Sequence, residues 1–276
     1  MTRRAHTPDA GPSGIASERK DMRTLAFYNL KGGVGKTAAA VNVACCAARD
    51  GQATCLWDLD PQGAASWYLR DTAGLELKAK KLLKEKNALD SQVRPTAFPG
   101  LDLIPADTTY RHLDLLFEQS DEPREVLAKL VKPLTDRYDL LVLDCPPSFS
   151  RLSENIFALA DTVAVPLIPT PLSMRALAQV SEFLARKDLD RGQLLPFFSM
   201  VDRRRQLHRQ WLTSPTEAPP NLLKTHVPYA SIVEQMGQRQ SPLVQFAPHS
   251  PAGQAYQSLW EELRQALGSG RSAERR

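Results

Sequence analysis

A glycine-rich run near the start of the chain has the composition of a phosphate-binding loop. Its residues are KGGVGKT, from Lys31 to Thr37. Glycines let the backbone turn sharply and bring its N–H groups close to an anion, because no Cβ atom obstructs the approach. The last two residues of the run, Lys36 and Thr37, are of the types that contact β/γ-phosphates and a Mg²⁺ ion. The alternative is a glycine-rich turn that matches the pattern by chance, and the secondary structure on either side of the run distinguishes the two interpretations.

Two further segments supply carboxylates at the ends of apolar runs. The run Ala53–Leu59 carries Asp58 near its end, and Asp60 follows it directly. A carboxylate just beyond a strand can orient an attacking water or hold a metal-bound water, although acidic pairs of this kind are also common in turns and caps. Asp144 ends the apolar run Leu140–Leu143, as a Walker B aspartate that holds Mg²⁺ would. The alternative there is a core strand that ends in a capping aspartate.

The elements around the glycine loop favour phosphate binding over a chance match. The apolar run Leu25–Leu30 predicts a buried strand, and Val41, Ala44, Cys45 and Ala48 then recur at helical spacing. A helix that starts at the loop directs the positive end of its dipole at a bound anion. Strand, loop and helix therefore predict a phosphate cradle.

The remainder of the chain alternates between the two kinds of element. Strands are predicted at 101–105, 161–169, 194–201 and 225–229, with helices at 107–117, 122–138, 172–186, 231–237 and 251–267. Such alternation indicates an α/β fold, a mainly parallel, doubly wound sheet with helices on both faces. We expect one domain over residues 23–267, with disordered tails at 1–22 and 268–276, which lack apolar periodicity.

Composition limits the class of protein further. The chain has 276 residues and a formal charge of +4, which permits nucleic-acid contact without requiring it. No run approaches the roughly eighteen apolar residues of a membrane span, and Met1–Ser17 lacks the apolar middle of a secretory signal. The four cysteines include no C-x-x-C pair, so we expect buried thiols in a cytoplasmic protein.

The lysine at the start of the loop, Lys31, marks a deviant Walker A motif. Together with DLDPQG at 58–63, LLVLDCPP at 140–147 and a VPY…SP…A-x-x-Y-x-x-L tail, it makes the chain similar to the ParA/MinD family of deviant Walker A P-loop ATPases. The similarity is greatest to the short Soj-like ParA proteins and extends from about Arg23 to about Leu267.

The resemblance implies ATP and Mg²⁺ as cofactors and assigns roles to individual residues. Lys31 would reach across a nucleotide-sandwich homodimer to the phosphates of the second protomer, Lys36 would hold its own phosphates, and Asp60 would position the hydrolytic water. The full set expected to contact ATP is Lys31, Gly32, Gly33, Val34, Gly35, Lys36, Thr37 and Ala38 around the phosphates, and Met200, Asp202, Pro228 and Tyr229 around the base. The set expected at the metal is Thr37, Asp58 and Asp144.

Two positions depart from the family pattern. Ala38 stands where a second hydroxyl commonly touches the α-phosphate, so that contact must come from the backbone alone. Ala64 stands where an asparagine often follows DPQG. Neither departure removes a catalytic group, but each is expected to weaken nucleotide binding or slow turnover.

Two basic segments have open interpretations. The arginines at 203–205 and 209 are either a solvated helix start or a contact for the DNA backbone, which requires several such charges. The lysine-rich stretch 74–90 is either a solvated helix face or a basic rim that touches DNA or a partner. The candidate DNA-binding residues are Arg203, Arg204, Arg205 and Arg209.

The resemblance therefore implies a ParA-type ATPase in the cytoplasm, associated with the nucleoid. Its ATP-bound homodimer would bind DNA non-specifically, and a ParB-like partner would stimulate slow hydrolysis while DNA or cellular cargo is segregated or positioned. The alternative is an ATP-dependent positioning adaptor for a protein complex, such as a chemoreceptor array, a microcompartment, or cellulose synthase or secretion machinery, without DNA binding. No membrane anchor is expected, because the last residues, GSGRSAERR, have no apolar face.

Overall fold

Eight strands form one sheet in the order β3-β4-β2-β5-β1-β6-β7-β8. The structure is a computed structural model and describes residues 22–85, 87–189, 192–213 and 218–274. All neighbouring strands are parallel except β3 and β4, which pair antiparallel. The strands are β1 (Arg23–Phe27), β2 (Thr54–Asp58), β3 (Arg94–Pro95), β4 (Leu101–Ile104), β5 (Leu140–Asp144), β6 (Thr162–Leu167), β7 (Gln193–Val201) and β8 (His226–Pro228).

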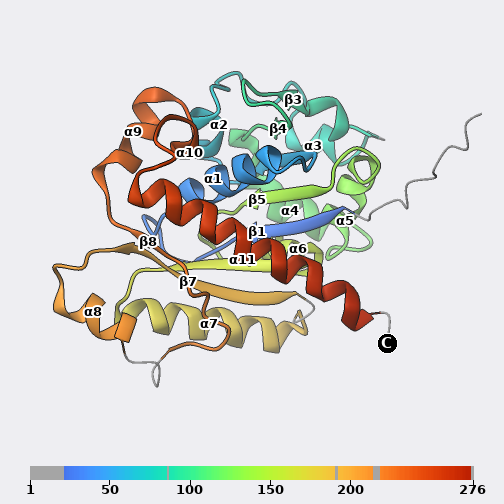
Figure 1. The fold of residues 1–276 in the computed structure, drawn as a ribbon. Coiled ribbons are helices and arrows are strands. Elements are labelled where there is room, and N and C mark those ends of the chain that lie inside the picture. Colours follow the sequence, from blue (N-terminus) through green and yellow to red (C-terminus); the bar gives the residue numbers. More distant parts are fainter. Residues whose placement is uncertain (1–21, 86, 190–191, 214–217, 275–276) are drawn as a thin grey trace, which may run out of the picture.

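Helices cover both faces of this sheet, as predicted (Figure 1). Alternate residues of β1 supply the two cores, with Leu25 and Phe27 on one face and Ala26 on the other. The Leu25 face is covered by α1 (Lys36–Arg49), α2 (Ala64–Tyr68), α9 (Ser231–Arg239), α10 (Leu243–Phe246) and α11 (Pro251–Glu274). The Ala26 face is covered by α3 (Ala79–Leu82), α4 (Leu113–Glu118), α5 (Val126–Val131), α6 (Arg151–Leu159), α7 (Pro171–Lys187) and α8 (Gln206–Thr213).

Helix α1 is buried on nearly every side, although its sequence shows only one strongly apolar stripe. It packs on the sheet and against α10 and α11, and Figure 1 shows α11 crossing the same face. Small residues such as Ala40, Ala44 and Ala47 allow this enclosure. The buried Asn42 fixes it further, because its amide donates to Ala38 O (2.7 Å) and accepts from Val244 N (3.0 Å).

Predicted and observed elements differ most between residues 70 and 138. The lysine-rich stretch 74–90 forms only the short α3, so a long solvated helix face was a wrong expectation. The side chain of Gln92 accepts from Glu76 N (2.9 Å) and Leu77 N (3.1 Å), so these two N–H groups are engaged outside any helix. The helix expected at 122–138 begins only at Val126, and Pro133 lies in the short 3₁₀ helix that follows it. Short 3₁₀ helices are η1 (Asp90–Gln92), η2 (Thr108–His112) and η3 (Lys132–Leu134).

The two predicted tails have different outcomes. The expectation for residues 1–22 concerns, apart from Met22, residues outside the described part of the chain. At the other end, α11 continues to Glu274, so helix replaces the irregular segment that was expected to start at residue 268. Within the described ranges, no helix combines the length and apolarity needed to cross a bilayer.

A buried carboxylate joins α6, α7 and the turn before α5 on the Ala26 face. Glu154 of α6 receives Arg151 Nη1 at 2.8 Å and Lys187 Nζ of α7 at 2.9 Å, and Arg124 Nε lies 3.7 Å away. Burial acts to raise the pKa of Glu154, but the hydrogen bonds from Lys187 and Arg151 together lower it. The four cysteines are buried and unpaired, as predicted, and burial raises the pKa of each thiol.

Candidate active site

The glycine-rich loop connects β1 to α1 at the carboxyl edge of the sheet. Gly33 and Gly35 have φ angles of +70° and +88°, in the left-handed region that favours glycine. A Cβ atom on Gly35 would also stand 2.9 Å from Ser199 Oγ of β7. The structure thus gives two reasons for glycine at position 35, of which the sequence indicated only the turn.

Asn29 holds this loop against the sheet. Its amide nitrogen donates to Pro166 O of β6 (2.7 Å), and its amide oxygen accepts from Lys31 N (2.9 Å). Our sequence interpretation passed over this residue, although a polar side chain inside the apolar run 25–30 was a signal of a structural or functional demand.

The two lysines of the loop have different environments. Lys36 is buried, and its ammonium donates to Lys31 O at 3.2 Å. Burial lowers the pKa of Lys36, while the charges of Asp144, Cys145 and Asp60 act to raise it. Lys31 is half-buried, and its ammonium has no hydrogen-bond or ion-pair partner among the described residues. The Lys36 ammonium is thus fixed inside the loop, whereas the Lys31 ammonium makes no such bond among the described residues.

Asp58 and Asp144 lie side by side at the ends of β2 and β5, where they are register partners. Both are fully buried. Asp58 Oδ2 accepts from Ser66 N and Ser66 Oγ, each at 2.8 Å, whereas neither oxygen of Asp144 has a hydrogen-bond partner among the described residues. The Thr37 hydroxyl faces Asp144 and acts to lower its pKa, but it does not reach hydrogen-bonding geometry. Burial and the charge of Asp58 together hold the pKa of Asp144 well above its usual range.

This arrangement fits a magnesium-bound triphosphate. A buried carboxylate without a partner is costly, and a cation is the group that removes the cost. Asp144 and Thr37 would hold Mg²⁺, which supplies charge neutralisation between phosphate oxygens. Asp58 was predicted to support the metal, but its Oδ2 already accepts two hydrogen bonds from Ser66, so this oxygen also holds the start of α2 in place. Ser66, eight residues beyond Asp58, was not indicated by any sequence signal.

Asp60 lies just beyond β2, in a half-exposed turn. Its Oδ1 accepts from Gln62 N (3.0 Å), and its backbone carbonyl accepts from Gly63 N (2.9 Å), directly before α2. Helix α2 is in turn attached to the end of α9, since Trp67 Nε1 donates to Gly237 O (2.9 Å) and Arg70 Nε donates to Gln240 O (3.1 Å). The turn that carries Asp60 is therefore joined through α2 to α9.

The residues predicted to contact a base gather at the other end of the same edge. An open hollow of ≈ 690 Å³ is lined by Asp202, Pro228 and Tyr229, together with Arg203 and residues at the start of α9. The side chain of Tyr229 is 51% exposed. Met200, also predicted there, does not line the hollow. Its φ of +53° lies where the β7–β8 register shifts between Phe198 and Val201.

Arg203, Arg204 and Arg205 lie in the turn between β7 and α8, Arg209 lies within α8, and all four are exposed. They are not equally free, because Arg204 Nε and Nη2 donate to the two oxygens of Asp202 at 2.9 and 3.0 Å. Arg209 Nη1 donates to the backbone carbonyls of Arg203 and Arg204 at 2.8 and 3.1 Å. The turn is thus rigid and basic, with part of its charge neutralised by Asp202.

Known proteins resemble this chain over most of its length. A family model described as an AAA domain matches residues 22–191. The chromosome-partitioning ATPase Soj of Treponema pallidum is 30% identical over 248 residues, which cover 87% of this chain and 96% of Soj.

Solved structures show the same fold. A Cyanothece McdA variant in complex with ATP superposes with a TM-score of 0.76 at 20% identity, covering 90% of this chain and 97% of that one. Cobyrinic acid a,c-diamide synthase from Mycobacterium smegmatis, with bound ADP and magnesium, superposes with a TM-score of 0.75 at 23% identity, covering 90% and 96% of the two chains.

Proposed function

Because this chain belongs to the ParA/MinD family of P-loop ATPases and lies close to its Soj-like ParA members, we propose that it works as an ATP-driven dimerisation switch. ParA-type ATPases act in partitioning or positioning. The observation that carries the ATP-binding part of the proposal is the buried carboxylate of Asp144, which has no hydrogen-bond partner among the described residues and lies beside the buried ammonium of Lys36. Both groups suit Mg·ATP and are costly without it.

The chemistry is divided among the residues of the site. Lys36 and the backbone N–H groups of the loop bind the phosphates, and Thr37 and Asp144 would hold the Mg²⁺ ion that neutralises charge on the phosphate oxygens. Asp60 orients the attacking water, because only its Oδ1 is engaged, by Gln62 N, and no hydrogen bond to Oδ2 is found among the described residues. Intrinsic ATP hydrolysis is slow if the negative charge of the transition state is fully stabilised only when a second protomer binds.

Lys31 is the residue proposed to complete the site of the second protomer. Its ammonium is half-exposed and uncommitted, whereas an internal role would give it a partner within the loop. A cation donated in trans to transferring phosphates acts as an arginine finger does and raises the rate of hydrolysis. Dimerisation and ATP binding would then be one event.

The finer cellular role is DNA or cargo positioning. The exposed arginine turn supports non-specific DNA binding by the ATP-bound dimer, with a ParB-like partner that stimulates hydrolysis and release. A positioning adaptor that binds no DNA is the second candidate, and the charge that Asp202 removes from the arginine turn favours it.

Light scattering with ATP, ADP or no nucleotide, with and without duplex DNA, tests the proposal. We expect a dimer only with ATP, and monomer for Lys31→Ala, which should still bind ATP. If Lys31→Ala dimerises as the wild type does, the in-trans assignment is wrong. If the wild-type dimer does not bind DNA at low salt, the protein is better described as a positioning adaptor.

A further inference from the structure

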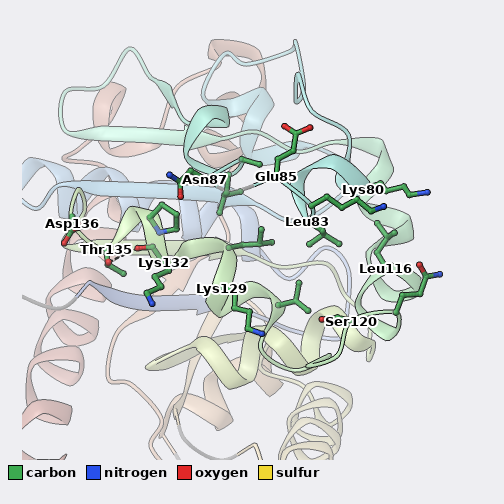
Figure 2. Close-up of a pocket in the computed structure, with 17 residues that line it drawn as sticks. Lys80, Leu83, Glu85, Asn87, Leu116, Ser120, Lys129, Lys132, Thr135 and Asp136 are labelled. Atoms are coloured by element: carbon green, nitrogen blue, oxygen red, sulfur yellow. Dashed lines mark hydrogen bonds between the residues drawn. The ribbon is translucent and has the colours of Figure 1, made fainter.

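A second large hollow lies far from the phosphate loop. It has a volume of ≈ 1080 Å³ and opens between the α3 segment on one side and the end of α4, α5 and η3 on the other. Figure 2 shows its side chains: Leu83 and Leu116 come from two different walls, and Lys129 and Lys132 come from a third. We call this hollow the lysine groove.

The floor of the lysine groove is apolar. Leu83, Leu116 and Leu130 line it, half-buried, and each packs on the hydrophobic core of the Ala26 face. The buried Val126 and Leu89 lie at the same surface. Apolar surface gathered in a concave site favours an occupant that brings apolar side chains of its own.

The rim of the groove is positively charged. Four lysines line it against two carboxylates, Glu85 and Asp136, a balance of +2. Lys129 forms an ion pair with Glu122. The other three, Lys80, Lys84 and Lys132, are exposed and have no hydrogen-bond or ion-pair partner among the described residues.

We propose that the lysine groove binds an acidic amphipathic helix of a partner protein. The charge of the rim selects carboxylates, and the leucine floor selects a stripe of apolar side chains. No strand contributes to the lining, so the groove offers no sheet edge for an added β-strand, and recognition must come from side chains. Helix in groove is the mode that fits these conditions.

Other occupants fit less well. Residues 1–21 carry four Lys/Arg and three Asp/Glu, and residues 269–276 carry three arginines and one glutamate, so neither end of this chain complements a basic rim. Duplex DNA presents phosphates and has no apolar side chains for the leucine floor. The chemistry of the groove is therefore that of an acidic, partly apolar protein segment.

The lysine groove is spatially separate from the phosphate-binding loop. Helix η3 leads into the amino end of β5, whereas Asp144 stands at its carboxyl end, about 13 Å away for a strand of this length. The groove also lies on the sheet face opposite α1. A helix could thus occupy it while the phosphate site works.

Fluorescence anisotropy of the full chain tests the proposal, with and without ATP. The probe is a labelled helical peptide with leucines at i, i+3, i+4 and i+7 and Glu or Asp elsewhere. Two control peptides replace either every leucine by serine or every acidic residue by lysine. We expect only the first peptide to bind, and salt to weaken its binding.

Two variants of equal net charge locate the binding. Lys84→Glu with Lys132→Glu reverses two rim charges and should weaken binding about tenfold or more. Lys78→Glu with Lys81→Glu alters exposed lysines of the same segment that do not line the groove, and should change it less than about threefold. Circular dichroism confirms that each variant is folded.

Three results would overturn the proposal: no binding beyond that of the serine peptide, equal loss in both variants, or displacement of the probe by duplex DNA with the same sensitivity to the rim variant. The last result would identify nucleic acid as the occupant.

Discussion

Replacing Asp144 by asparagine should stabilise the protein in the absence of nucleotide and abolish its stabilisation by Mg·ATP. In the wild type the fully buried carboxylate of Asp144 has no hydrogen-bond partner in the described part of the chain, and it lies next to Asp58. An amide of the same shape removes the buried charge and can donate to the Asp58 carboxylate. The gain from removing such a group is about 2 kcal/mol.

The pH dependence of the free energy of unfolding tests independently whether the Asp144 carboxylate destabilises the folded protein. Burial raises the folded-state pKa of both Asp58 and Asp144. Between the unfolded pKa, near 4, and the raised values, the folded state holds protons that the unfolded state has released. The wild type therefore loses stability as the pH rises through this window, and Asp144→Asn should lose less.

Urea unfolding and thermal scans measure both effects. Without nucleotide, and with EDTA, the variant should melt about 4–8 °C higher, since 1 kcal/mol shifts the midpoint of a domain of this size by about 2–4 °C. With Mg·ATP at one hundred times its Kd, the wild type should gain about 2.7 kcal/mol and the variant much less.

Asp161→Asn is the matched control, because Asp161 Oδ1 accepts from Arg23 Nη1 (2.8 Å) and its Oδ2 accepts from Thr24 N (2.7 Å). That variant should lose about 1–2 kcal/mol at neutral pH. A wild type that is as stable as Asp144→Asn without nucleotide would refute the reasoning, since the Asp144 carboxylate would then have a partner in the folded protein.

Three further changes test the site and the scaffold. Gly35→Ala should lower the free energy of unfolding by about 1–2 kcal/mol and weaken ATP binding, because φ at this position is +88° and the new Cβ atom meets Ser199. The control Gly32→Ala places its Cβ atom in open space and should leave the free energy of unfolding unchanged, which urea unfolding measures. Asp60→Ala should leave ATP binding intact and trap the dimer in light scattering; undiminished phosphate release would place water orientation elsewhere. Glu154→Gln should lose about 1–2 kcal/mol at pH 7, and because the folded pKa of this carboxyl is lowered, the deficit should shrink as the pH falls below about 4; a deficit that does not change with pH would contradict the ion cluster.

Most of the sheet could be predicted from the sequence because buried parallel strands are apolar runs. Leu140–Leu143 is apolar throughout, and β5 occupies it with Asp144 at its end, as predicted. Strand β3 was missed, since two residues with a proline give no periodic signal.

The stretch 74–90 shows why local pattern fails. Its lysines suit a helix, but Gln92 takes the backbone N–H groups of Glu76 and Leu77, and Arg94 Nη2 donates to Gly74 O (2.6 Å). These partners are distant enough in sequence that no periodicity reveals them.

The site was predictable where a motif fixes the backbone and less so where side chains meet across the fold. Gly33 and Gly35 have the left-handed backbone that a tight loop needs, and Asp58 and Asp144 are neighbours at the ends of β2 and β5. Ser66 and Ser199 reach the site from elsewhere in the chain, and their roles depend on contacts with Asp58 and Gly35. The lysine groove could not be predicted from the sequence either, because its three walls come from separate segments.

The attachment of α2 to α9 makes the two ends of the nucleotide site mechanically dependent on each other. The turn that carries Asp60 leads into α2, and the hollow beside Tyr229 leads into α9. Because Trp67 and Arg70 donate to the last carbonyls of α9, we expect a displacement of the Asp60 turn to be transmitted through α2 to the hollow beside Tyr229. A change at Asp60 and a change in that hollow would then be successive stages of one movement.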